Sequence, residues 1–243
     1  MIEVKAISKS FGKVEAVKNV TFSAPDQQIT ALLGANGAGK TTTLRMIYSL
    51  ITPQSGEISI DGINPRFEPE KARKLLGILP DTRGLYKRLS ARENITYFGQ
   101  LHGMSVKHIN QRIDSLVEDL RMADFIERRC DGFSQGQRVK VAIARALVHD
   151  PQNIILDEPT NGLDVMSTRG VRRFLQKEKQ RGKCILFSSH VMQEVAAVSD
   201  EILVVNDGVI CASGTQLELQ NQTNKDNLED AFVHIVTSGA GHE

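Results

Sequence analysis

The hydrophobic residues of the chain fall into two kinds of short segment. Four segments are continuous apolar runs: ITALL, KLLGIL, NIIL and CILF, at residues 29–33, 74–79, 153–156 and 184–187. Runs of this length without polar alternation are typical of parallel strands that are buried on both faces. We therefore predict an α/β fold built on a mostly parallel sheet.

The segments near the N-terminus have a different pattern. Apolar and polar residues alternate in IEVKAI, VKNVTFSA and GEISIDG, and turn residues separate these segments. A period of two residues indicates strands with only one buried face. They predict a small antiparallel β-subdomain beside the main sheet. Near the other end of the chain, Asn206-Asp207-Gly208 separates EILVV from VICAS, which predicts a hairpin.

Helical periodicity dominates residues 85–149. Ser90 and Glu93 have the spacing of a capping box, and apolar residues recur at helical intervals through residues 106–125. We predict a helical subdomain inserted into the α/β domain at about residues 85–149. The whole domain is expected to span residues 1–220, and the tail at 221–243 to contain one short helix.

The segment that says most about chemistry is GANGAGKTT, residues 34–42, which follows a predicted strand and precedes a predicted helix. It fits the pattern G-x-x-x-x-G-K-[ST], which in this context predicts a phosphate-binding P-loop. Gly34, Gly37 and Gly39 let the backbone wrap a phosphate. Lys40 can reach the β- and γ-phosphates, and the Thr41 hydroxyl can ligate Mg²⁺. The other loop residues expected at the nucleotide are Asn36, Ala38 and Thr42.

Two adjacent carboxylates, Asp157 and Glu158, follow the apolar run NIIL. Burying charges at the end of a strand is costly unless they meet a cation or perform chemistry. Beside a P-loop we expect Asp157 to hold Mg²⁺ through water and Glu158 to face the attacking water. Without the P-loop, the same pattern would describe only a solvated strand end.

Composition and charge narrow the possible functions. The 243 residues are 40% hydrophobic and 24% charged, with a formal net charge of +1. These values are ordinary for a globular domain, and they argue against a basic nucleic-acid-binding surface. No apolar run approaches the ~20 residues of a membrane helix. The cysteines are odd in number and lack C-x-x-C spacing, which favours a reducing compartment. We expect a cytoplasmic protein without a nucleic-acid partner.

The segment GFSQGQRVKVAIARALVHDP carries a more specific signal. Ser134 and Gln137 form a capping box, which a well-capped helix would explain by itself. The segment nevertheless resembles the signature motif of ABC-transporter ATPases, whose usual form is Leu-Ser-Gly-Gly-Gln. Ser134, Gly136 and Gln137 match that motif, while Phe133 and Gln135 replace its leucine and first glycine. The resemblance implies that this helix start faces the γ-phosphate of an ATP held by a second subunit, and a helix N-terminus suits such an anion.

The resemblance extends over almost the whole chain. Residues 161–164, Asn-Gly-Leu-Asp, are similar to the family's D-loop, which crosses the dimer interface. His190, after the run CILFSS, looks like the switch histidine that contacts the γ-phosphate. Phe11 stands where the family places an aromatic residue that stacks on adenine, although an aromatic beside an N-terminal strand can equally belong to the core.

One position departs from the family pattern. After the strand that corresponds to KLLGIL, the family has the Q-loop glutamine, which touches Mg²⁺ and transmits movement to the membrane partner. Asp81 stands at this position. Aspartate can also ligate Mg²⁺, a cation that prefers oxygen ligands. Its side chain is shorter, however, and it adds negative charge near the triphosphate.

Outside the catalytic motifs, GLYKRLSARENITYFGQLHG and the stretch around the signature motif look closest to NatA-type subunits of sodium-extruding ABC transporters. This resemblance implies a subunit that binds and hydrolyses ATP with Mg²⁺. It would form a homodimer, or a heterodimer with a similar subunit, around two MgATP. The dimer would drive an integral membrane permease from the cytoplasmic face of the cell membrane and export sodium ions.

The sequence also leaves three alternatives to sodium export, and it argues against the second and the third. The subunit could energise the export of a drug or another small molecule. It could be a soluble ABC ATPase acting on DNA, ribosomes or iron–sulfur assembly, although the tandem domains, coiled coils and basic extensions of such relatives are not visible. A P-loop kinase or GTPase is opposed by the signature motif and by the lack of an Asn-Lys-x-Asp sequence.

Overall fold

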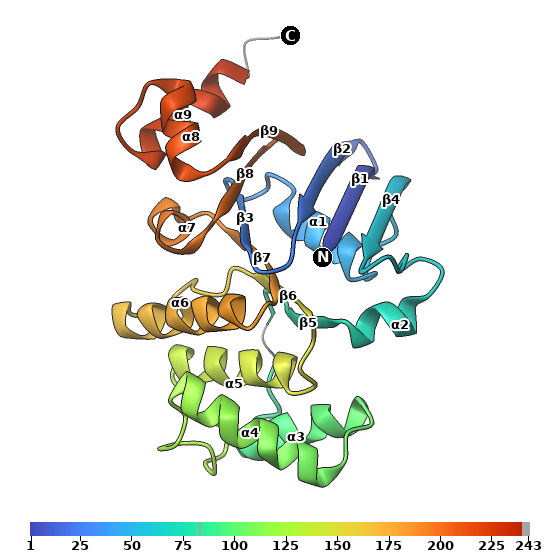
Figure 1. Cartoon of the computed structure of the whole chain (residues 1–243), viewed down its shortest axis with the longest axis vertical. Coiled ribbons are helices and arrows are strands. Elements are labelled where there is room, and N and C mark those ends of the chain that lie inside the picture. The colour runs from blue at the N-terminus through green and yellow to red at the C-terminus, as the bar shows by residue number, and fades with distance from the viewer. Residues whose placement is uncertain (83, 240–243) are drawn as a thin grey trace.

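The computed structural model describes residues 1–82 and 84–239, and its larger sheet has six strands (Figure 1). These are β3 (Ile29–Leu33), β5 (Leu76–Leu79), β6 (Asn153–Asp157), β7 (Cys184–Ser189), β8 (Glu201–Asn206) and β9 (Val209–Gly214). They pair in the order β5-β6-β7-β3-β8-β9, and every pair is parallel except β8 with β9. The predicted mostly parallel sheet is confirmed.

A second, three-stranded sheet is antiparallel. It consists of β1 (Ile2–Phe11), β2 (Val14–Ala24) and β4 (Ser55–Ile60), in the order β2-β1-β4. This is the antiparallel β-subdomain that the alternating segments predict. The β8–β9 hairpin also forms where Asn-Asp-Gly predicts it, and both Asp207 and Gly208 adopt positive φ angles, 44° and 81°.

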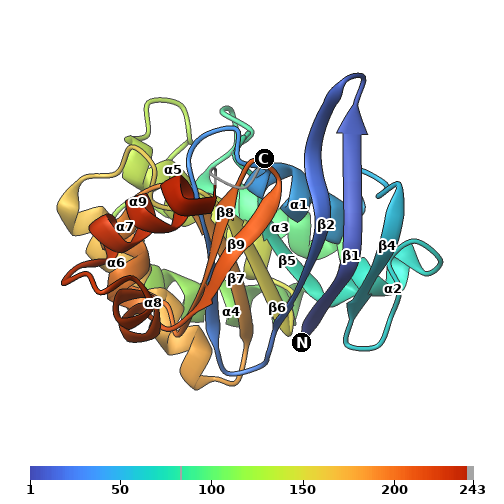
Figure 2. The same ribbon diagram turned by 90° about the horizontal axis from the view of Figure 1, so that it is seen from above.

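The larger sheet is buried on both faces. Successive residues of a strand point to opposite sides of the sheet, so neighbouring residues enter different cores. In β3, Ile29, Ala31 and Leu33 belong to a core shared with the helices on one side. Leu32 belongs to a second core on the other side. That second core also contains residues of α1 (Lys40–Ile47) and of the antiparallel sheet, so α1 lies between the two sheets (Figure 2).

Three helices lie together at one end of the molecule (Figure 1): α3 (Ala91–Leu101), α4 (Val106–Leu120) and α5 (Gln135–Leu147). They follow β5 and precede β6 in the chain, within the range expected for the helical subdomain. The predicted capping box is present at the start of α3, where Ser90 accepts from the Glu93 backbone and Glu93 accepts from the Ser90 backbone. The remaining helices are α2 (Pro69–Lys74), α6 (Val165–Gln180), α7 (Met192–Val198), α8 (Gln216–Thr223) and α9 (Leu228–Gly239).

Two details differ from the expected elements. The run KLLGIL begins inside α2, and its strand starts only at Leu76, because Pro69 opens a short helix that includes Lys74. The second difference is α8, which crosses the boundary expected at residue 220. A capping box of Thr215 and Glu218 starts this helix, a signal that the sequence interpretation missed. The helix expected in the tail is α9, and residues 240–243 of that tail lie outside the described residues.

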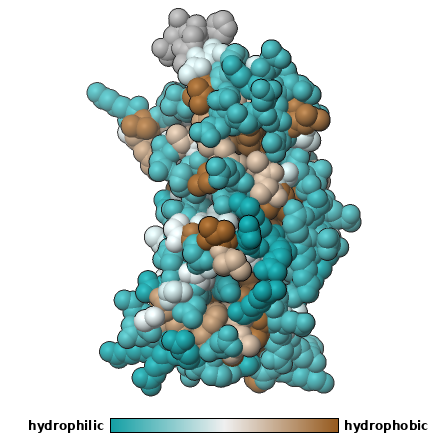
Figure 3. All heavy atoms as spheres, turned by 90° about the vertical axis from the view of Figure 1, so that its left-hand side faces the viewer, coloured by the Kyte–Doolittle hydropathy of each residue, from teal (hydrophilic) through white to brown (hydrophobic). Residues whose placement is uncertain are grey.

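The surface on the left-hand side of Figure 1 is mostly hydrophilic, with small separate apolar patches (Figure 3). Among residues 1–82 and 84–239, no helix has both the length and the apolar composition needed to cross a membrane.

Candidate functional site

The P-loop joins β3 to α1, as its sequence predicts. Gly37 and Gly39 have φ angles of 87° and 103°, which disfavour any other residue. The loop also passes close to the backbone of two distant segments. A Cβ on Gly34 would meet the carbonyl oxygen of Val205 at 2.3 Å, and one on Gly39 would meet that of Ala16 at 2.4 Å. Close packing as well as backbone conformation therefore requires glycine here.

Lys40 places a buried positive charge inside this loop. Its Nζ donates to the carbonyl oxygens of Gly34, at 2.7 Å, and Ala35, at 3.0 Å, and lies 3.6 Å from Oε1 of Glu158. The side chain is 5% exposed. Burial lowers the pKa of Lys40, an effect that the neighbouring carboxylates of Glu158 and Asp157 oppose. An ammonium in this position suits a phosphate group.

Asp157 ends β6 at the carboxyl edge of the sheet. Its Oδ1 accepts hydrogen bonds from Ser188 Oγ, at 2.5 Å, and from Thr41 Oγ1, at 3.1 Å. Its Oδ2 is buried and has no hydrogen-bond partner within the part of the chain that the structure describes. Burial raises the pKa of Asp157, and the neighbouring carboxylates of Asp81 and Glu158 add to this.

A buried carboxylate oxygen without a donor is costly unless a cation meets it. The hydroxyl of Thr41 and the carboxylate of Asp157 are hard oxygen ligands, so the residues present fit Mg²⁺. No cluster of three or more His, Cys, Asp or Glu among the described residues could hold a metal alone. Mg²⁺ is usually held by one or two carboxylates together with water and phosphate oxygens, and Asp157 and Thr41 supply protein ligands of this kind.

Ser188 is a functional position that the sequence interpretation missed. It lies directly opposite Asp157 in the parallel pairing of β6 with β7. Its hydroxyl donates to Asp157 and accepts from the backbone N–H of Glu158 at 3.0 Å. The serine at the end of the apolar run CILF was the available signal, because a polar residue at the end of a buried strand needs a partner.

Glu158 and His190 meet at the same edge. Nδ1 of His190 lies 2.9 Å from Oε2 of Glu158, whose other oxygen faces Lys40. Glu158 has a φ of 49°, an unusual angle for a residue with a side chain. Strained backbone of this kind clusters at functional sites. The side chains are 16% exposed for Glu158 and 35% for His190. Glu158 lines the adjoining cavity, whereas His190 is not among its lining residues and contacts it through Glu158.

Asp81 follows β5 and reaches the same region. Its carboxylate lies 3.3 Å from the guanidinium of Arg45, on α1, and the two side chains are 41% and 35% exposed. The structure therefore places Asp81 beside the P-loop and pairs it with a cation.

A cavity of about 270 Å³ lies over the P-loop. Its lining residues are Ala16, Asn36, Gly37, Gly39, Lys40, Thr41, Thr42, Asp81 and Glu158. Most of the loop residues expected at the nucleotide are thus brought to one cavity, whereas Gly34 and Ala38 are not among its lining residues, and Ala38 is buried. Phe11 is not among the lining residues. It ends β1, is 49% exposed, and has the Lys9 ammonium 5.6 Å from its ring centre.

The signature-like residues are at the start of α5. Ser134 and Gln137 form the predicted capping box, with distances of 3.0 and 3.2 Å. Gly136 packs against α6, because a Cβ at this position would meet Ser167 Oγ at 2.4 Å. None of the three lines the P-loop cavity of the same chain. Gln135 lines a neighbouring cavity of about 450 Å³ that also contains Asp81 and Glu158.

Comparison with known proteins identifies the family of the chain. The ABC transporter family profile matches residues 17–161. NatA, an ABC transporter ATP-binding protein of Bacillus subtilis, is 41% identical over 93% of the chain and 92% of its own length. The linearmycin resistance ATP-binding protein LnrL of the same organism is 32% identical over 98% of the chain and 76% of its own length.

Solved structures of ABC-family ATP-binding proteins also match the chain. The ATP-binding subunit of an ABC transporter superposes with a TM-score of 0.88 and 29% identity, covering 97% of this chain and 99% of its own. A dimeric ATP-binding cassette bound to ADP and Pi superposes with a TM-score of 0.80 and 25% identity, covering 88% of this chain and 98% of its own. The chain belongs to the ABC transporter family, as an ATP-binding subunit.

Proposed function

We propose that the chain binds and hydrolyses MgATP as one of two such subunits that drive a membrane permease, and that the transported ion is sodium. One observation supports the ATPase part above all others. The groups proposed to act on ATP converge on the carboxyl edge of the sheet. They are Lys40 of the P-loop, Asp157 and Glu158 at the end of β6, and His190 after β7. Topologically, this is the edge at which α/β proteins bind their ligands.

Each residue has a role in this proposal. Lys40 supplies the positive charge for the β- and γ-phosphates, and Thr41 and Asp157 hold Mg²⁺, which neutralises charge on the phosphate oxygens when bound. Glu158 accepts a proton from the attacking water. His190 orients the carboxylate of Glu158 through their 2.9 Å contact, and we propose that it also contacts the γ-phosphate. Ser188 fixes Asp157 through its hydroxyl.

Asp81 is proposed to replace the Q-loop glutamine as a further oxygen ligand for Mg²⁺. An added carboxylate near a triphosphate would normally repel it. Arg45 offsets that charge at 3.3 Å, so the site carries an extra anion together with its own counterion. For Phe11 we propose the adenine contact. Its exposed ring is at the end of β1, and the next strand of the same hairpin, β2, contributes Ala16 to the P-loop cavity.

Ser134, Gly136 and Gln137 are proposed to complete the site of a partner subunit, since they do not line the P-loop cavity of their own chain. The dimeric cassette among the similar structures supports this arrangement.

The free energy of closing such a dimer can come from contacts with the γ-phosphate. Charge-assisted hydrogen bonds contribute about 1.5–3 kcal/mol each. Converting a mostly open pair into a mostly closed one needs about 5.5 kcal/mol of differential binding. Two or three γ-phosphate contacts per site would therefore close the dimer, and hydrolysis would release it.

The permease and the sodium ion are proposed from the relatives. The 41% identity to NatA, an ABC transporter ATP-binding protein, supports a transport subunit. Sodium export from the cytoplasmic face of the membrane is proposed from the sequence resemblance to NatA-type subunits of sodium exporters. The linearmycin resistance protein supports the alternative of drug export. The segment from Asp81 to Tyr86 and the helical subdomain are the proposed contact with the permease.

Reconstitution of the chain with its permease in sodium-loaded vesicles tests the proposal. We expect ATP-dependent sodium flux that Glu158→Gln abolishes. Flux of a drug without sodium flux would transfer the assignment to the drug-export alternative. A nucleotide-loaded assembly in which Ser134 lies far from the partner's ATP would overturn the shared site.

A further inference from the structure

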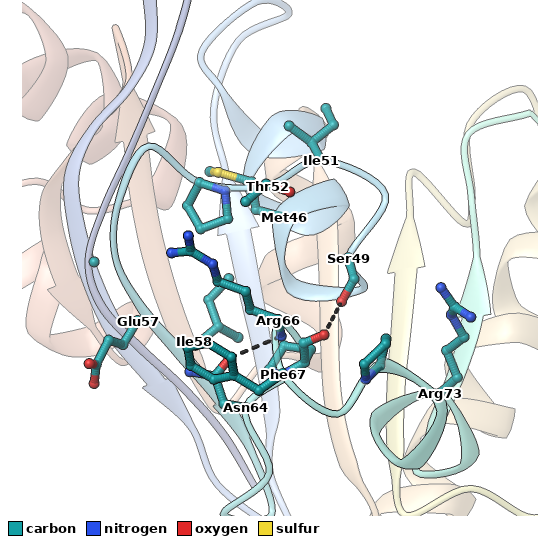
Figure 4. A pocket seen from close by; sticks show the side chains of 14 residues that line it. Met46, Ser49, Ile51, Thr52, Glu57, Ile58, Asn64, Arg66, Phe67 and Arg73 are labelled. Atoms are coloured by element: carbon teal, nitrogen blue, oxygen red, sulfur yellow. Dashed lines mark hydrogen bonds between the residues drawn. The ribbon is translucent and has the colours of Figure 1, made fainter.

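A second cavity, of about 250 Å³, shares no lining residue with the P-loop cavity. It lies between the C-terminal end of α1, strand β4 and the segment that leads into α2 (Figure 4). Nothing in the proposed ATPase cycle uses it.

The floor of this cavity is apolar. Met46 and Ile58 are 1% and 4% exposed, and the partly buried Ile51 lies beside them. Three prolines, Pro53, Pro65 and Pro69, line the remaining wall. Because proline has a fixed φ, this wall is rigid before any ligand arrives. Rigid apolar concavities are the usual form of small-molecule sites.

One hydrogen bond links the segment between β4 and α2 to the turn after α1, and a second lies within that segment. Ser49 Oγ donates to the carbonyl oxygen of Pro65 at 3.4 Å, and the Asn64 side chain accepts from the backbone N–H of Arg66 at 2.9 Å (Figure 4). The cavity therefore has a preformed shape, which reduces the entropy that binding would cost.

Two guanidinium groups give the cavity its charge. Arg66 extends over the floor from the loop, and Arg73 extends from α2 on the other side (Figure 4). Neither forms an ion pair with an acid in the described part of the chain, and Arg66 has only the ring of Phe67 5.9 Å away. Glu57 is the one acid among the described lining residues, and its side chain points away from Arg66 in Figure 4.

Phe67 adds an aromatic ring to the rim and is 76% exposed. Such exposure of a phenyl ring next to an apolar floor gives a flat ligand a surface to stack on. An apolar floor, an aromatic rim and two guanidinium groups that form no ion pair with any described acid together match a ligand with an apolar body and an anionic group. We propose that this cavity binds a small organic anion of the aromatic carboxylate class.

The probe for this site is 2-naphthoate, and its neutral isostere 2-naphthamide is the matched control. Binding is followed by the ¹³C-methyl signals of isoleucines, since Ile51 and Ile58 line the cavity while Ile113 lies in the helical subdomain. We expect saturable shifts of the Ile51 and Ile58 signals with naphthoate, no shift of Ile113, and binding of naphthamide that is about tenfold weaker.

Two variants test the chemistry. Arg66→Gln together with Arg73→Gln should weaken naphthoate binding about tenfold or more and leave naphthamide unchanged. Arg169→Gln, a change at an exposed arginine on α6, is the control and should alter neither. Ile51→Trp, which fills the cavity, should abolish the Ile58 shift with either probe while the remaining methyl spectrum stays that of the folded protein.

Three results would overturn the proposal. One is equal affinity for the two probes, and another is naphthoate binding that survives the double arginine change. The third is a set of shifts spread over Ile113 as well as the cavity isoleucines, because that pattern would show non-specific adsorption.

Discussion

Nδ1 of His190 lies 2.9 Å from Oε2 of Glu158, although the two residues are 32 positions apart in the chain. The pairing of β6 with β7 brings them together, since Asp157 is opposite Ser188, Glu158 follows Asp157 directly and His190 follows Ser188 by two positions. The contact links the proposed base to the residue proposed to orient it.

Glu158→Gln should slow ATP hydrolysis roughly 100-fold or more while preserving ATP affinity, because glutamine cannot accept the proton. ATP should then hold the variant as a dimer in size-exclusion chromatography. Glu229→Gln, at the start of α9, is a matched control that should hydrolyse ATP normally. A Glu158→Gln protein with the normal hydrolysis rate would exclude Glu158 from its proposed role.

His190→Ala should reduce the turnover rate while leaving the KM for ATP within a few-fold, because its partner Glu158 acts on water and not on the bound nucleotide. Steady-state kinetics separates the two parameters. His108→Ala, at an exposed histidine near the start of α4, should change neither. A large rise in KM with normal turnover would assign His190 to binding alone.

Asp81→Gln should leave hydrolysis intact or raise it if Asp81 performs the task of the Q-loop glutamine. The unfolding free energy should fall by no more than about 1 kcal/mol, because the Arg45 pair is partly exposed to solvent. Urea unfolding and a Mg²⁺ titration of activity measure the two effects. Collapse of folding would show instead that Asp81 is structural.

Gly136→Ala should destabilise the isolated subunit by about 1–3 kcal/mol, because the new methyl group meets Ser167 Oγ. Adding Ser167→Gly should restore most of that stability. Hydrolysis should stay impaired in the double variant if Gly136 also faces a partner's nucleotide. Full recovery of hydrolysis would limit Gly136 to the contact with α6.

The unfolding free energy should fall between pH 6.5 and pH 4 because of His149. Burial and the ring of His102, stacked 3.6 Å away, lower the pKa of His149 from 6.5 to about 4. A group with a folded-state pKa below its unfolded value stabilises the folded protein above the unfolded pKa. That contribution is lost as the pH falls towards the folded pKa, and here it amounts to about 3 kcal/mol.

Urea unfolding of the wild type and His149→Gln at several pH values tests this. The variant should lose this part of the pH dependence, and His108→Gln, at an exposed histidine, should retain it. Parallel curves for the wild type and His149→Gln would contradict the assignment.

The sequence predicts the elements of this protein better than their contacts. The apolar runs identify the buried strands, and the P-loop is recognisable because its glycines, lysine and threonine have fixed spacing. The role of Ser188 is not predictable in this way, since it depends on a strand register that brings it opposite Asp157. The same holds for Arg45, which is unremarkable until the fold places it beside Asp81.

The hairpin turn at Asp207-Gly208 supports the P-loop through backbone hydrogen bonds. Gly208 donates to the carbonyl oxygen of Ala38 at 3.1 Å and accepts from the backbone N–H of Lys18 at 2.7 Å. Residues near positions 18, 38 and 208 thus meet at one point. During translation, these hydrogen bonds cannot form until the ribosome has synthesised the hairpin. The P-loop therefore reaches its final packing late in synthesis.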